Sequence, residues 1–137
     1  MISSICDSII TALGGIANVK KVGAWAGDLD TLLSMPQNMP GLYLVYQTAK
    51  FAQAPATMGT VKVDSVMKFQ ILLIVSSLKN PSTAATTAWG IIEAVRTALI
   101  GLQISTYNNL WPESEELVFS EGGLLVYGMN YSLDVRV

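Results

Sequence analysis

The sequence predicts an α+β fold in which one long helix and one N-terminal helix pack on a mostly antiparallel sheet. Three stretches lead to this prediction. Residues 60–77 alternate between apolar and polar side chains, and residues 125–137 do so again up to the end of the chain. Between them, residues 81–102 repeat their apolar side chains every three or four positions. Period two is typical of a strand and period 3.6 of a helix, so strands flank a helix that must bury its stripe on their sheet.

The strand predicted over residues 60–77 changes character along its length. Its apolar side chains on one parity are Val61, Val63, Met67, Phe69, Ile71, Leu73 and Val75. In the second half Leu72 and Ile74 make the other parity apolar as well. We therefore expect the strand to leave an exposed edge or hairpin and to enter a region that is covered on both faces.

The long helix has a clear start signal and one apolar stripe. Asn80 can cap it, and Pro81 at the first helical position loses no useful N–H. The stripe consists of Ala84, Ala88, Ile91, Ile92, Val95, Leu99 and Leu102.

The chain before residue 60 predicts one helix and one strand, with weaker elements between them. Ser4-Ile5-Cys6-Asp7 has the form of a capping box for a helix over Ser4–Ile16. Lys20–Ala26 is a strand candidate, and residues 28–33 could form a helical turn. Leu42–Phe51 is predicted to be a strand. Ala52–Gly59 is rich in small residues, so we expect a hairpin tip or mobile loop that becomes ordered against a neighbour.

After the long helix, residues 105–112 read as a turn region because Asn108-Asn109 and Trp111-Pro112 interrupt any periodic pattern. Leu117-Val118-Phe119 is a short strand candidate, and Glu121-Gly122-Gly123 is a tight turn. The closing strand runs from Leu125 to Val137, so the C-terminus is expected to be held in the sheet.

Length and composition favour one domain over residues 1–137 with a large apolar fraction. Apolar residues make up 51% of the chain and charged residues 13%, which is low for the surface of a monomer. Either the core is simply well packed, or apolar surface is buried between subunits. No apolar run reaches the roughly 18–20 residues that a membrane span needs. A signal peptide is not expected, and the single Cys6 fits a reducing cytosolic folding environment as a small core hydrophobe.

The sequence lacks the residues that most catalytic mechanisms require. The chain has no histidine, which removes the commonest general base, and one cysteine without histidine leaves zinc without a ligand set. No phosphate-binding glycine motif occurs. The net charge of −2 gives no basic field for nucleic acid. We therefore expect no cofactor, no metal and no enzymatic activity.

The acidic residues Glu113, Glu115, Glu116 and Glu121 form the one concentration of charge. A solvated acidic loop is the simplest interpretation. A carboxylate pair for acid–base work is an alternative. In a ring, Glu113, Glu115 and Glu116 could instead face the lumen and repel DNA phosphates, so that DNA passes without specific binding.

A second stripe on the long helix is the best candidate for an interface. Trp89, Glu93, Arg96 and Ile100 lie roughly 120° from the core stripe, and Glu93 can pair with Arg96 across one turn. A tryptophan and an isoleucine beside a charge pair have the composition of an interface anchor. The alternative is that the same chain covers Trp89. Further interface candidates are Phe51, Gln53, Pro55, Met58 and Trp111.

The layout resembles the small tail proteins of Mu-like phages, in particular the tail-terminator (neck) family. The resemblance rests on the helix Ser4–Ile16, the strands Pro40–Tyr46 and Phe69–Val75, the closing strand and, most specifically, the helix segment Ile91–Leu102. Ser76-Ser77-Leu78-Lys79 departs from the basic Arg-Asn-Leu-Arg-like turn that members tend to carry, so no contact is inferred there.

This resemblance implies a structural virion protein that is assembled in the host cytoplasm and has no catalytic residues. Copies would form a homo-oligomeric ring, six-fold in the family, that caps the tail tube and sheath of a contractile tail and meets the head–tail connector. Two alternatives stay open. One is a related neck, head-completion, stopper or baseplate-adaptor protein, and the other is a small hydrolase or ligand-binding domain that uses the acidic residues.

Overall fold

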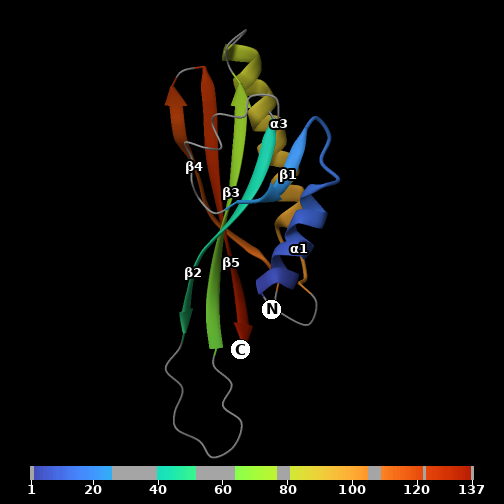
Figure 1. Cartoon of the computed structure of the whole chain (residues 1–137), viewed down its shortest axis with the longest axis vertical. Coiled ribbons are helices and arrows are strands. Elements are labelled where there is room, and N and C mark those ends of the chain that lie inside the picture. Colours follow the sequence, from blue (N-terminus) through green and yellow to red (C-terminus); the bar gives the residue numbers. More distant parts are fainter. Residues whose placement is uncertain are drawn as a thin grey trace, which may run out of the picture.

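The computed structural model describes residues 2–25, 40–51, 64–76, 81–104, 109–121 and 123–136. Two helices lie on one face of a strongly twisted sheet (Figure 1). The helices are α1 (Ile2–Leu13) and α3 (Pro81–Leu99). The strands are β1 (Lys21–Ala24), β2 (Gly41–Phe51), β3 (Asp64–Ser76), β4 (Trp111–Glu121) and β5 (Leu124–Arg136). The α+β class is therefore confirmed.

The described strands form one five-stranded sheet in the order β1-β2-β3-β5-β4. β3 pairs with β2 and with β5 in antiparallel ladders, and β4 pairs antiparallel with β5. β1 is the exception, because it runs parallel to β2 through Val22↔Leu42. The sheet is thus mixed, where the sequence predicted a mostly antiparallel one, and its two edges are β1 and β4.

The core lies between the helices and the sheet because alternate strand residues and the helix stripes meet there. Ile5, Ile9 and Leu13 of α1 and Ala88, Val95 and Leu99 of α3 are fully buried against Phe69, Ile71 and Leu73 of β3. Cys6 packs against this cluster, and burial, then the neighbouring Asp7, raise the pKa of its thiol. Burying these side chains supplies the main driving force for folding.

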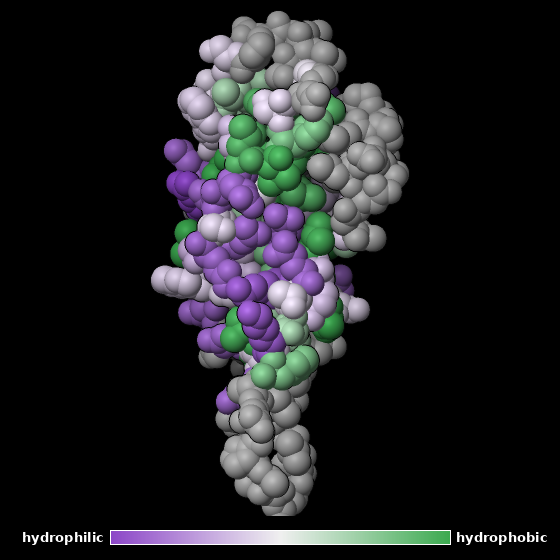
Figure 2. Space-filling model, turned by 90° about the vertical axis from the view of Figure 1, so that its left-hand side faces the viewer, coloured by the Kyte–Doolittle hydropathy of each residue, from purple (hydrophilic) through white to green (hydrophobic). Residues whose placement is uncertain are grey.

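The opposite face of the sheet carries a smaller apolar cluster. Tyr43, Leu72, Ile74 and Val126 are buried there, and Trp25 packs edge-on against Tyr43 with ring centroids 5.9 Å apart. This confirms that the second half of β3 is covered on both faces. Toward the other end of the molecule the same face is polar, and Figure 2 shows a hydrophilic band across the side turned away from the helices.

Several element boundaries differ from the sequence prediction. α1 begins at Ile2, so Ser4 lies inside the helix, where its carbonyl accepts a hydrogen bond from Ser8 Oγ. The predicted capping box with Ser4 as the cap is therefore wrong. α3 begins at Pro81 as predicted but ends at Leu99, because Gly101 adopts a φ of 75° and donates its N–H to the Leu110 carbonyl. The predicted hairpin tip Ala52–Gly59 and the turn at residues 28–33 lie outside the described residues.

Candidate interaction site between α3 and the sheet edge

The acidic stretch differs most from the structure that the sequence predicts. Glu113, Glu115 and Glu116 belong to the edge strand β4, not to a loop. Two irregularities in its pairing with β5, between Pro112 and Ser114 and between Leu117 and Phe119, disturb the alternation of its side chains. That disturbance is why the sequence predicted only a short strand here.

The register of β4 distributes the three glutamates over both faces of the sheet. Glu115 lies opposite Met129, a core residue, and therefore on the helix face. Glu116 lies opposite Gly128, on the other face. Glu113 also reaches that other face, where its Oε2 is 3.4 Å from Lys68 Nζ. The three acids therefore do not form a single acidic surface.

A groove runs between α3 and the outer strands, and we call it the α3–β4 groove. Its volume is about 440 Å³. It is lined by Trp89, Ile92, Glu93, Arg96, Glu115, Glu116, Leu117 and Tyr127. Trp89 and Leu117 remain 56% and 52% exposed, so the described part of the chain does not cover the tryptophan. A tryptophan and an arginine that line one groove have the composition of an interface anchor.

An ion pair crosses this groove. Arg96 Nε donates a hydrogen bond to Glu115 Oε2 at 2.8 Å, and Arg96 Nη2 donates a second one to Glu115 Oε1. The hydrogen bonding and charge of Glu115 raise the pKa of Arg96. The ion pair of Arg96 is thus with Glu115 and not with Glu93, because the planar carboxylate of Glu115 accepts both N–H groups. The charge of Glu93 acts on Arg96 only as a smaller contribution that also raises its pKa.

Beneath the ion pair, Tyr131 is 1% exposed and its hydroxyl has no hydrogen-bond partner among the described residues. Burial first, and then the charge of Glu115, raise the pKa of this phenol to about 12. Tyr131 therefore belongs to the core under the ion pair and does not line the groove itself.

The remaining predicted interface residues are scattered. Ile100 follows the end of α3 and is exposed, but it does not line the groove. Trp111 begins β4 opposite Ser132, on the face away from the helices, and is 62% exposed. Phe51 ends β2 and is 61% exposed. Gln53, Pro55 and Met58 lie outside the described residues.

The β-strand half of the groove was not predicted from the sequence, namely Leu117, Tyr127 and the role of Glu115. The opposite charges of Arg96 and Glu115 were the available signal, but the 19 positions between them gave no local reason to pair them. The proline and the run of polar residues in β4 concealed it by resembling a loop.

No helix among the described residues has the length and apolarity to cross a membrane. The same residues contain no group of three side chains placed to hold a metal ion.

The same fold occurs in a solved structure. The chain is similar in structure to a subunit in the virion of a native gene transfer agent particle, with a TM-score of 0.62 and 17% sequence identity over 99% of this chain and 97% of that one. At this identity the similarity establishes the fold. No curated protein matches the sequence.

The family model for phage tail terminator proteins matches residues 7–137. The chain therefore belongs to the phage tail terminator family, as the resemblance indicated. It is a structural protein of the phage tail and neck region, and its location is the virion.

Proposed function

We propose that six copies of this protein form a ring that terminates the tail at the head–tail junction. The number of subunits is the one that the family resemblance implies. In this role the ring caps the tail tube and the sheath of a contractile tail and presents its other side to the head–tail connector. The observation that carries the proposal is the α3–β4 groove, which Trp89 and Leu117 line with exposed side chains on a chain of low charge. Exposed apolar surface of this kind is typical of subunit contacts.

Two further features support a ring. Both edges of the described sheet, β1 and β4, lack a further strand partner, and exposed edges are normally covered or paired. In addition, Phe51 and Trp111 leave two large aromatic side chains in solvent at separate places. A subunit in a closed ring presents two different contact surfaces, which fits such a distribution.

The lumen of the ring would be lined by the polar face of the sheet. We assign Glu113 and Glu116 to this wall, where Lys68, Asn130 and Ser132 share the face. Glu115 is excluded from it because it binds Arg96 on the helix face. A polar wall of mixed charge would let DNA pass without specific binding.

Electron microscopy of the purified protein with its cognate tube protein tests this function. We expect rings at one end of each tube and arrest of tube elongation. Trp89→Ala should lose the rings, while Ile2→Ala, which removes an exposed apolar side chain from α1, should keep them. Tubes that elongate unchanged in excess wild-type protein would contradict the capping role.

The neighbouring role of a head-completion, stopper or baseplate-adaptor protein requires the same fold. The position of the subunit in a map of the intact particle separates it from the terminator. A hydrolase or ligand-binding role would require Glu113, Glu115 and Glu116 to act together, but their division over two faces disfavours it.

A further inference from the structure

The strands at the two edges of the sheet carry opposite charge. β4 contains four glutamates and no basic residue. At the opposite edge of the sheet, β1 and β2 contain Lys21 and Lys50 and no acidic residue. Among the described residues, Lys50 and Glu116 are both exposed and neither has an ion-pair partner.

Each edge of the sheet also has a stretch of strand with no neighbouring strand on its outer side. β4 is paired only on the side of β5. β1 covers β2 only from Gly41 to Leu44, so residues 45–51 have no strand on their outer side within the described part of the chain. Figure 1 shows this half of β2 at the left of the lower part of the sheet, on the side opposite α1. In this stretch β3 takes the backbone groups of alternate residues, and the N–H and C=O groups of the others point outward. Seven residues of this kind are long enough to form a ladder.

From these observations we propose that the outer half of β2 from one copy pairs antiparallel with β4 of the next copy, with Lys50 opposite Glu116. This inference rests on the proposed ring and names the contact that closes it. Within one subunit β4 already runs antiparallel to β2. Rotation about an axis parallel to the strands therefore brings these two edges together with the antiparallel polarity.

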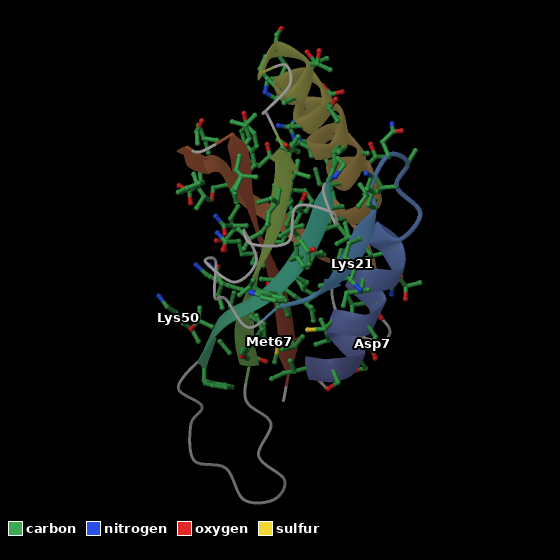
Figure 3. All side chains as sticks on the ribbon, turned by 45° about the horizontal axis from the view of Figure 1, so that its top comes forward. Asp7, Lys21, Lys50 and Met67 are labelled. Carbon is green, nitrogen blue, oxygen red and sulfur yellow. The ribbon has the colours of Figure 1, made fainter. Side chains whose placement is uncertain are left out.

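The faces of the side chains agree with this register. Lys50 lies opposite Val66, and Met67 next to Val66 is a core residue, so Lys50 is on the face away from the helices. Figure 3 shows Lys50 pointing away from the body of the molecule. Glu116 is on the same face, and cross-strand pairs form only between side chains on one face.

The same register places Phe51 opposite Glu115, on the helix face. There the exposed Phe51 ring of one copy would enter the α3–β4 groove of its neighbour, beside Trp89 and Leu117. Pairing of β4 with another β4 would instead set acids against acids, so the charge pattern favours a head-to-tail contact over a two-fold one.

Charge reversal at each edge tests the contact. Glu116→Lys and Lys50→Glu should each weaken self-association about tenfold per interface, because each places like charges opposite one another. A 1:1 mixture of the two variants should assemble into rings in which they alternate, and the Lys50→Glu/Glu116→Lys double variant should assemble alone. Asp134→Lys, an exposed acid on the same face but on the inner strand β5, is the matched control and should assemble as wild type.

Native mass spectrometry reads out both mass and composition of the rings. Assembly of Glu116→Lys equal to wild type, or no alternating rings in the mixture, overturns the edge pairing but leaves the ring intact. A wild-type protein that stays monomeric overturns the proposed ring together with the pairing. Normal assembly of Lys50→Glu combined with loss in Glu116→Lys would show that the partner of Glu116 is not Lys50 of β2 and would also overturn the proposal.

Discussion

Arg96 of α3 holds Glu115 of β4 through two parallel N–H···O hydrogen bonds, and this pair joins the long helix to an edge strand. The two residues are 19 positions apart in sequence. Because the pair spans the groove, it fixes the separation of Trp89 on the helix from Leu117 on the strand. The geometry of the candidate interface therefore depends on it.

The first prediction concerns this pair. Arg96→Lys keeps the positive charge but loses the fork of two donors, so it should weaken the coupling to Glu115. We expect a double-mutant cycle with Glu115→Gln, measured by urea unfolding, to give a favourable coupling that declines with added salt because the pair is partly exposed. Zero coupling at low salt would contradict a structural role for the pair.

The second prediction concerns Trp89. Since its side chain is largely exposed, Trp89→Ser should change the stability of the monomer by less than about 0.5 kcal/mol. Self-association should weaken roughly 30-fold, as expected for loss of an aromatic anchor. Sedimentation equilibrium measures the effect, with Ile2→Ser on α1 as the matched exposed control. Equal association of both variants would show that the groove is not a contact.

The third prediction concerns the core under α1. Ile9 is fully buried, so Ile9→Ala should lower the free energy of unfolding by about 2–4 kcal/mol through lost burial and a residual cavity. Ile2→Ala at the exposed start of the same helix should cost less than about 0.5 kcal/mol. Chemical denaturation of both variants checks the difference, and similar costs would mean that α1 does not dock as described.

The fourth prediction concerns Gly128, where an added side chain would have to displace two neighbouring side chains. A Cβ there would lie 2.8 Å from Gln70 Nε2 and 2.9 Å from Val118 Cγ2. Gly128→Val should therefore cost about 1–3 kcal/mol by overpacking the junction of β5 and β4. Val118→Ala should recover part of that loss in the double variant. An additive double variant would show that Val118 is not the obstacle.

The fifth prediction is a pH dependence. Unfolded Tyr131 loses its proton near pH 10, while the folded protein keeps it until about pH 12. Between these values the unfolded state binds fewer protons, so the free energy of unfolding falls as pH rises, by about 2 kcal/mol over the window. Tyr131→Phe should remove this part of the loss and be neutral or stabilising at pH 7, because the buried hydroxyl has no described partner. Denaturation of both proteins across this pH range tests it.

Local patterns were sufficient to predict the elements that build the core. The alternation around Phe69 and the start of α3 at Pro81 appear in the structure nearly as expected, because both depend on neighbouring residues alone. The parallel pairing of β1 was beyond prediction, since four residues carry no signal for their partner.

In the candidate site, too, the helix residue could be predicted from the sequence and the strand residues could not. Trp89 stood out on the helix because regular spacing identifies its face. Leu117 and Glu115 did not, because the irregular register of β4 removes the period-two pattern on which strand prediction depends. The partner of Arg96 was misassigned for a related reason, since Glu93 is close in sequence whereas Glu115 comes near only when the sheet forms.

Native mass spectrometry of the wild-type protein over a range of concentrations is the most direct test of self-association through the sheet edges and the α3–β4 groove. We expect a closed assembly of six subunits, with no open series of larger species. A single monomeric mass at every concentration, also in the presence of the cognate tube protein, would contradict it.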